Sequence, residues 1–459
     1  MENINQKDKM RSMPVKKLIL SMGIPMVLSM MLQAVYNIVD SAFVSNIQDT
    51  GELALNALTL AFPLQLLIVA IGIGTGVGCN ALLSKSLGQG NIEKASKVAG
   101  NGMFLALIIY IIFLIFGIFG TDLYISSQTK NPIISKMAID YLKVCCIASF
   151  GIIFFSIFEK LLQGTGHSMY STIAQIVGAV INVILDPIMI YGYFGCPKLE
   201  VKGAAYATVI GQIASFILAL IFHFKVNTNI SNGLKYIKPS AIIIKQIYAI
   251  GLPAIISQAL LSIMTYALNI ILVSVDEALV TAYGLYYKIQ QFILFAGFGL
   301  RDTITPIISF SHGMEDKKRI DNGIKFGMVY TIAIMSFGLI LVEILAIPFS
   351  NVFGLSGVTQ QYCISAMRIV SISFIFAGMN ITYQGIFQAL NGGIQSLIVS
   401  VCRQFIFVIP IAWIFSLIAK HSLDLSWLIW TTFIIAETIS VIIAHILMKR
   451  LYNKEVNDI

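Results

Sequence analysis

The sequence predicts an all-α integral membrane protein with twelve transmembrane helices, arranged as two parallel, pseudo-symmetric six-helix bundles. Of its 459 residues 57% are hydrophobic and only 11% are charged, whereas about 25% is usual for water-soluble domains. The apolar runs are continuous and reach the roughly 20 residues that a helix needs to cross the hydrocarbon core. They are about twice as long as the alternating segments of a transmembrane β-barrel. Helices are therefore the expected spanning elements.

Six of the predicted spans precede the one long polar connection in the chain. They cover residues 15–45, 54–84, 97–120, 137–161, 170–194 and 203–224. The basic N-terminus followed by an apolar run is similar to a signal peptide, but the run is longer than such a segment and no small-residue cleavage site follows. We therefore interpret it as the first span.

The other six predicted spans follow the polar connection from Lys225 to Lys245, which contains the sequence NTNISNG. They cover residues 247–273, 281–311, 324–348, 359–387, 395–418 and 426–448. Because this is the only long polar connection in the chain, we expect two lobes, residues 1–235 and residues 236–459.

Lys and Arg are distributed unevenly between the connections. If the N-terminus is cytoplasmic, twenty of them lie on the cytoplasmic side and six on the other side. The positive-inside rule therefore predicts a multi-pass protein of the cytoplasmic (inner) membrane with both termini in the cytoplasm, surrounded by membrane lipid. The basic residues form no continuous patch, so the net charge of +8 does not indicate nucleic-acid binding.

The two halves of the chain repeat each other. A shift of 225 residues pairs Gln65 with Gln290, Gly72 with Gly297, Ser84 with Ser309, Gln163 with Gln388 and Gln212 with Glu437. Six is an even number, so both halves enter the membrane from the same side and the repeat is parallel, related by an axis along the membrane normal. We expect the two bundles to face a central cleft.

Four acids interrupt the apolar spans: Asp40, Asp186, Glu343 and Glu437. Acids at membrane depth are costly and usually functional. Helical spacing places polar residues on one face with each of the first two: Gln33, Tyr36 and Asn37 precede Asp40, while Gln175, Gly178 and Asn182 precede Asp186. A third polar stripe contains Thr208, Gln212 and Ser215.

Two carboxylates that share a poorly hydrated site repel each other, so one holds a proton unless a cation lies between them. Asn182 and Thr208 add the oxygen ligands that a hard cation prefers. We predict an H⁺ or Na⁺ site at Asp40, Asn182, Asp186 and Thr208, with Asp186 as its principal carboxylate. Glu343 and Glu437 lack acidic partners; each is either a second site or structural.

Two prolines occupy matching places in the first and seventh spans. Pro25 and Pro253 each remove a backbone hydrogen bond and permit a kink. Bending at these prolines could couple ion binding to the shape of the cleft, and a static kink is the alternative.

Four segments carry a resemblance to a known family: YNIVDSAFVS (Tyr36–Ser45), QGTG (Gln163–Gly166), GAVINVILDPIMIYG (Gly178–Gly192) and VKGAAYATVIGQ (Val201–Gln212). Together with the six-plus-six repeat they resemble the multidrug and toxic compound extrusion (MATE) family over essentially the whole chain. The resemblance implies the MATE fold and an antiporter in which H⁺ or Na⁺ drives export of lipophilic cations through a V-shaped cleft.

Carried over by position, the resemblance implies a cation site at Asp40, Asn182, Asp186 and Thr208, with Tyr36 and Tyr141 in the surrounding network. Some branches of the family also carry acids in the seventh and tenth spans. In this sequence the seventh span has no acid after Pro253, and the tenth has Asn380 and Gln384 in place of an acid. We expect no enzyme activity, no cofactor beyond the coupling ion, and a monomer.

Two other functions compete with antiport. A flippase for lipid-linked saccharides would need many basic residues for pyrophosphate in its cleft, but the interior offers at most Lys288, Arg301, Arg368 and Arg403. An intramembrane aspartyl protease also uses two acids, but the GxGD setting of that family is absent from the sequence. Antiport is therefore the favoured interpretation.

Overall fold

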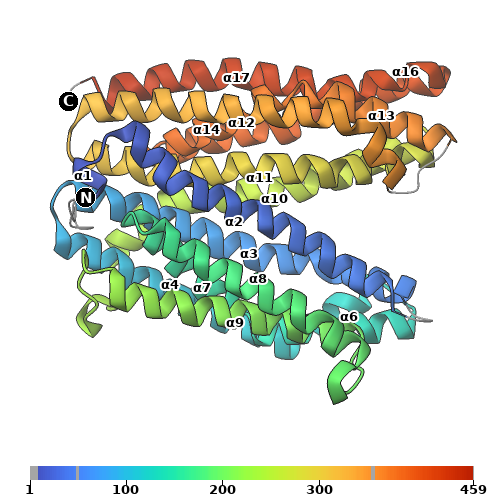
Figure 1. Ribbon diagram of the computed structural model, residues 1–459, viewed down its shortest axis with the longest axis horizontal. Helices are drawn as coiled ribbons and strands as arrows, with labels where there is room; N and C mark the ends of the chain where they lie inside the picture. Colours follow the sequence, from blue (N-terminus) through green and yellow to red (C-terminus); the bar gives the residue numbers. More distant parts are fainter. Residues whose placement is uncertain (1–8, 48–50, 353–356, 458) are drawn as a thin grey trace. The chain divides into compact units, whose positions relative to one another are not determined.

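The computed structural model describes residues 9–47, 51–352 and 357–457, together with Ile459. Within these residues every regular element is a helix (Figure 1), as the sequence predicts. The elements up to the polar connection are α1 (Lys9–Ser12), α2 (Val15–Ser45), α3 (Gly51–Gly88), α4 (Ile92–Phe119), α5 (Thr121–Ser126), α6 (Pro132–Ile147), α7 (Phe150–Gly164), α8 (Ser168–Tyr191), η2 (Tyr193–Gly195), α9 (Val201–Val226) and η3 (Leu234–Tyr236).

The remaining elements begin after the connection. They are α10 (Ala241–Val273), α11 (Glu277–Gly313), α12 (Lys317–Val352), α13 (Gly357–Ser371), α14 (Phe374–Ala389), α15 (Gly393–Val401), the π-helical turn η4 (Cys402–Ile406), α16 (Val408–His421), η5 (Leu423–Leu425) and α17 (Trp427–Glu455).

In the described part of the chain, ten segments are long and apolar enough to cross a membrane, and two bent helix pairs bring the number to twelve. The helices α6 and α7 meet at 45°, and α13 and α14 at 51°. The sequence predicts unbroken spans here, because neither break contains proline or glycine. The second helix of each pair begins after a serine, Ser149 or Ser373, at nearly the same place in the repeat.

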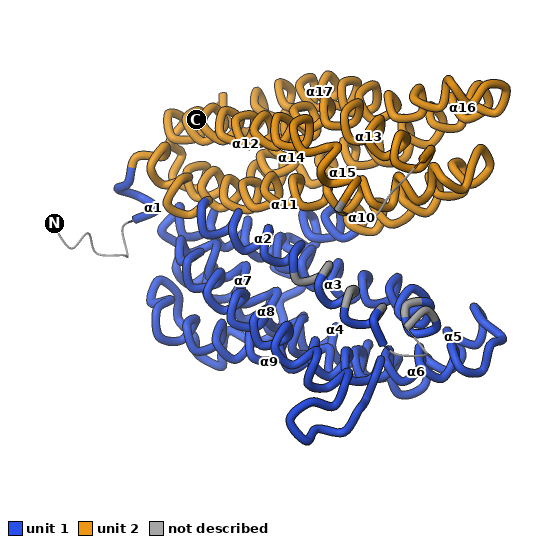
Figure 2. Tube along the Cα trace, turned by 45° about the vertical axis from the view of Figure 1, so that its right-hand side comes forward, with its two compact units in different colours: residues 1–13, 24–255 blue, residues 14–23, 256–459 orange. Residues whose placement is uncertain are grey.

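The chain divides into two compact units (Figure 2). Unit 1 comprises Met1–Met13 and Ile24–Ile255, and unit 2 comprises Pro14–Gly23 and Ile256–Ile459. The division therefore runs through α2 and α10. Pro25 and Pro253, the two prolines of the predicted kinks, are both buried inside these helices.

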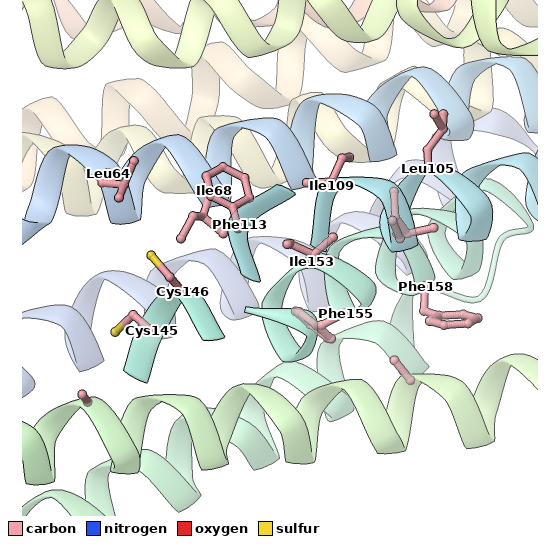
Figure 3. Packing of buried hydrophobic residues seen from close by; sticks show 14 of the residues in the cluster. Leu64, Ile68, Leu105, Ile109, Phe113, Cys145, Cys146, Ile153, Phe155 and Phe158 are labelled. Atoms are coloured by element: carbon pink, nitrogen blue, oxygen red, sulfur yellow. The ribbon is translucent and has the colours of Figure 1, made fainter. Parts of the chain in front are cut away.

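Unit 1 has a core of aliphatic, aromatic and cysteine side chains (Figure 3). Leu64 and Ile68 of α3, Phe113 of α4, Cys146 of α6 and Ile153 of α7 are among its buried members. The helix α8 packs along α9, and α3 packs along α7. This packing holds the polar stripes of α8 and α9 against each other.

Unit 2 has its own core. Tyr283 and Tyr286 of α11, Phe374 of α14 and Trp430 of α17 are almost completely buried in it. The helix α11 packs against α12, α13 and α14, and α17 packs against α13, α14 and α16.

One hydrogen bond repeats in both units. The Ser84 hydroxyl donates to the Gly164 carbonyl at 2.9 Å, joining α3 to α7. The Ser309 hydroxyl donates to the Ala389 carbonyl at 3.2 Å, joining α11 to α14. Both partners are related by 225 residues, so the repeat found in the sequence is also a repeat of contacts.

Candidate functional site

Four residues predicted to bind the coupling ion come together in unit 1. Asp40 lies on α2, Asn182 and Asp186 on α8, and Thr208 on α9. The Asn182 Nδ2 group donates to Asp186 Oδ1 at 3.3 Å and to Thr208 Oγ1 at 3.4 Å. The carboxyl groups of Asp40 and Asp186 lie within hydrogen-bonding reach of each other. Three separate helices therefore contribute polar groups to one place.

The site is largely buried and rich in acceptors. Asp186 is fully buried, and Asn182 is 3% exposed. Three oxygens, Asp40 Oδ1, Asn182 Oδ1 and Asp186 Oδ2, are buried and have no hydrogen-bond donor among the described residues. Two adjacent carboxyl groups can hydrogen-bond to each other only if one of them carries a proton. A bound cation would likewise relieve the repulsion between two ionised carboxylates. The arrangement is therefore suited to holding an exchangeable positive charge.

Small residues bring α9 close enough to α8 for Thr208 to meet Asn182. A side chain on Gly178 would overlap the Ser215 hydroxyl and the Gly211 carbonyl, and one on Gly211 would press on the Asn182 side chain. Such small-residue crossings are typical of membrane helices, because close backbone contact supplies packing energy in the absence of a hydrophobic driving force. Gly178, the glycine of the second polar stripe, therefore allows α8 and α9 to approach each other closely at the site.

Tyr141 of α6 lies near the site and bonds to Gln65 of α3. Its hydroxyl donates to Gln65 Oε1 at 3.4 Å, and the ring is 2% exposed. The charge of Asp40 is near enough to act on this hydroxyl. Gln65 is absent from the predicted site, although the sequence pairs it with Gln290 in the repeat.

A second polar group lies on the same faces of α2 and α8. Gln175 Nε2 donates to Gln33 Oε1 at 3.0 Å, and the Ser29 hydroxyl donates to Gln175 Oε1. The sequence predicts Gln33 and Gln175 but not Ser29, which lies one turn before Gln33. The side chains of Tyr36 and Asn37, also predicted here, lie outside the described residues.

Tyr191 fixes the helices that carry the two acids. Its hydroxyl donates to the Phe43 carbonyl at 2.7 Å, so the end of α8 is tied to α2 one turn beyond Asp40. Nothing in the spacing of Tyr191 suggests this role, because its partner is a backbone atom 148 residues away.

The two further acids have different surroundings. In unit 2 Glu437 accepts hydrogen bonds from Arg403 and Asn380, all three buried. Glu343 is half-buried and accepts from the Ser371 hydroxyl at 2.9 Å. Arg403 was grouped by sequence with the scattered basic residues of the spans, so the ion pair was not predicted.

Known proteins match this chain in sequence over most of its length. The family model described as MatE matches residues 25–188 and residues 253–414, once in each half of the repeat. The multidrug export protein MepA of Staphylococcus aureus is 26% identical over 445 residues, covering 95% of this chain and 94% of that protein. MepA of Staphylococcus saprophyticus is 23% identical over 426 residues, covering 93% and 92%.

Solved structures share the fold. A MATE family transporter of the MOP superfamily in an outward-facing conformation superposes with a TM-score of 0.90 at 24% identity, covering 99% of this chain and 100% of that one. A MATE structure in the straight conformation gives a TM-score of 0.90 at 24% identity, with 98% and 100% covered. The predicted fold class is therefore confirmed.

Proposed function

The chain belongs to the MatE family, and we propose on this basis that it is a secondary active multidrug efflux antiporter exporting lipophilic cations in exchange for H⁺ or Na⁺. The observation that carries the ion coupling is the pair formed by Asp40 and the fully buried Asp186, with Asn182 bonded to Asp186. The export of drugs is supported by relatives that are named multidrug export proteins.

In the proposed mechanism Asp186 is the principal coupling carboxylate and Asp40 is its partner. An arriving H⁺ or Na⁺ relieves the repulsion between the two carboxylates. Asn182 orients Asp186 through Nδ2 and offers Oδ1, while Thr208 offers its hydroxyl oxygen to a cation. Loss of the ion restores the repulsion, which favours a different arrangement of α2 and α8.

We propose residues 1–235 and 236–459 as the functional lobes of a transporter that provides a path for the drug across the membrane. Bending of α2 at Pro25 and of α10 at Pro253 would change that path as the ion exchanges. We place both termini in the cytoplasm and the chain in the cytoplasmic membrane as a monomer surrounded by lipid, on the charge distribution of its connections.

Export of a pyrophosphate-linked lipid is less well supported. Of the basic residues considered for binding pyrophosphate, Arg301 contacts Asp302 at 2.8 Å and Arg403 contacts Glu437 at 2.6 Å. A guanidinium already engaged by a carboxylate is a poorer phosphate ligand, because its charge is balanced and some of its donors are already used. The antiporter is therefore the preferred function.

The test is transport in proteoliposomes that contain ethidium. A pH gradient and a Na⁺ gradient are imposed separately, and the gradient that drives ethidium movement identifies the coupling ion. Asp186→Asn should abolish gradient-driven movement at every pH, and Asp40→Asn should nearly do so, because a neutral amide cannot exchange a proton or balance a cation.

The matched control is Asp122→Asn, which removes an exposed carboxylate bonded to Lys143 at 2.8 Å. Transport by this control should equal that of the wild type. Normal gradient-driven transport by a well-folded Asp40→Asn, Asp186→Asn double variant would exclude the proposed site.

A further inference from the structure

Unit 2 contains a buried charged cluster that the proposed transport mechanism does not use. Arg403 Nη2 and Nε donate to Glu437 Oε1 at 2.6 and 3.0 Å. On the other side of the carboxylate, Asn380 Nδ2 donates to Glu437 Oε2 at 2.7 Å and to the Glu437 carbonyl at 3.0 Å. Arg403 is 6% exposed, Glu437 is 8% exposed and Asn380 is fully buried.

A local change in helix geometry brings Arg403 to this position. The segment Cys402–Ile406 is a single π-helical turn between α15 and α16, closed by a bond from the Phe407 amide to the Cys402 carbonyl at 3.1 Å. Such turns insert an extra residue into a helix and are frequent at functional sites. In the repeat, Arg403 corresponds to Gly178 and Glu437 to Gln212, so the same crossing that unit 1 fills with glycine carries an ion pair in unit 2.

Oxygen atoms and aromatic rings surround the pair. The Asn380 Oδ1 atom and the Tyr286 hydroxyl are buried, and the described part of the chain supplies neither with a hydrogen-bond partner. Tyr286 lies within electrostatic reach of Glu437. The ring of Tyr286 is 6.4 Å from that of Phe433, and Tyr283 stacks on Trp430 at 6.5 Å. Carboxylate, amide and hydroxyl oxygens are the ligands of a hard cation.

From these contacts we propose that Glu437 is the centre of a latent cation site in unit 2, and that Arg403 is a tethered cation which permanently occupies it. Two of the five guanidinium donors meet one carboxylate oxygen, where a free monovalent cation would otherwise bind. Unit 2 therefore keeps its charge balanced without taking up an ion. This rests on the proposed function only in that it explains why coupling would be confined to unit 1.

The proposal predicts that a free cation can bind at Glu437 once the Arg403 guanidinium is removed. Arg403→Gln should open a site for Na⁺ or H⁺ at Glu437, whereas a merely structural ion pair would leave only a destabilised helix crossing. Among the described residues, Arg403 from η4 and Tyr286 from α11 are titratable groups that lie close to Glu437. On α17 itself His445 lies two turns away, where it is bonded to Tyr383 at 3.1 Å.

Trp430 can serve as a reporter near the ion pair, because it lies seven residues before Glu437 on α17 and stacks on Tyr283, whose ring neighbours that of Tyr286. The chain has 3 tryptophans, so Trp413→Phe and Trp427→Phe leave Trp430 as the sole indole. Asp186→Asn is included in every protein to remove any response from unit 1. Fluorescence of the purified full chain is then recorded against NaCl at constant ionic strength, with choline as the replacing cation, and separately against pH without Na⁺.

The background protein should give a flat response to Na⁺ and to pH between 5 and 8 (the range chosen for the assay). Arg403→Gln should give a saturable response to at least one of the two, and Arg403→Gln with Glu437→Gln should remove it. Arg403→Lys, which keeps a tethered cation, should remain flat. The proposal would be overturned if Arg403→Gln and Arg403→Gln with Glu437→Gln gave identical responses. It would also be overturned if the background protein itself responded to Na⁺ or to pH.

If Arg403→Gln does not survive purification, freshly solubilised membranes are compared by size-exclusion chromatography. Recovery of monodisperse Arg403→Gln should rise with Na⁺ or at acid pH, and recovery of the double variant should not. Equal dependence in both would overturn the proposal. Because neither measurement involves transport, failure of the antiport function would leave these results unchanged, and the two hypotheses are tested separately.

Discussion

Asn182 of α8 bonds to Asp186 on its own helix and to Thr208 on α9 in the proposed coupling site. We expect Asn182→Leu, which preserves the volume, to raise the Na⁺ concentration for half-maximal ethidium efflux by about tenfold or more. The substitution removes Asn182 Oδ1, a buried oxygen without a donor among the described residues that a cation would use as a ligand. An interaction with a charged group contributes about 1.5–3 kcal/mol. The measurement is efflux from proteoliposomes over a series of Na⁺ concentrations and pH values.

Thr208→Val provides the matched comparison. It removes only the hydroxyl at 3.4 Å from Asn182 Nδ2 and keeps the branched shape, so its effect should be smaller than that of Asn182→Leu. An Asn182→Leu protein with wild-type cation dependence would contradict the role given to this amide.

Sequence spacing could predict residues that share one helical face, and it could not predict partners from distant helices. Asn182 and Asp186 are four residues apart, so their contact is local and readable. The bond from Tyr191 to the Phe43 carbonyl depends on how α8 lies against α2, and a tyrosine in an apolar span gives no sign of it. Arg403 was missed for a related reason, because its direction is set by a π-helical turn.

At the scale of elements, the crossing of α8 and α9 depends on Gly178. We expect Gly178→Ala to destabilise the protein by about 1–3 kcal/mol, the usual cost of overpacking, because the added carbon would overlap the Ser215 hydroxyl and the Gly211 carbonyl. Thermal unfolding of the detergent-purified protein measures the change, and ion-driven efflux should fall as Thr208 moves away from Asn182.

Gly284→Ala is the control for helix propensity. This glycine lies within α11 and has no atom within 4 Å of the position of a new side chain, so the substitution should be neutral or slightly stabilising. Equal loss of stability in the two variants would show that the crossing is not the cause.

The turn between α7 and α8 makes stability depend on pH. Burial and the nearby Lys9 of α1 lower the pKa of His167 below its usual 6.5. An unfolded chain therefore takes up a proton below about pH 6.5 that the folded chain resists, so His167 makes the protein less stable as pH falls. The melting temperature of the wild type should drop more steeply from pH 7.5 to 5.5 (assay conditions) than that of His167→Gln.

His167→Gln keeps a group that can bond to Thr165, whose hydroxyl lies 3.2 Å from His167 Nδ1. Since every other titratable group is shared by the two proteins, the difference between their pH profiles isolates this histidine. Parallel profiles would refute its contribution.

At the scale of the whole molecule, the sequence predicts the internal repeat but only some of the differences between its two halves. Gly76 lies against the buried Lys160, and at the positions 225 residues later Gly385 lies against Arg301. In unit 1 the glycine lies on α3 and the basic residue on α7, whereas in unit 2 the basic residue lies on α11 and the glycine on α14. Each unit therefore packs one long basic side chain against one glycine. Alignment of the halves shows matched residues such as Ser84 and Ser309, whereas exchanged pairs become visible only when the helices are packed.

The same divergence predicts asymmetric ion coupling. Ile411 and Phe433 occupy the repeat positions of Asp186 and Thr208, and the buried acid of unit 2 is already balanced by Arg403. We expect Arg403→Gln with Glu437→Gln, which removes both charges together, to retain at least about half of wild-type ion-driven efflux and an unchanged half-maximal cation concentration. Removing one charge alone would strand the other, which typically costs about 3–5 kcal/mol, so the double variant is the informative one. Asp40→Asn with Asp186→Asn should abolish efflux under the same gradients. Loss of coupling in the folded unit 2 variant would show instead that ion exchange requires both halves of the repeat.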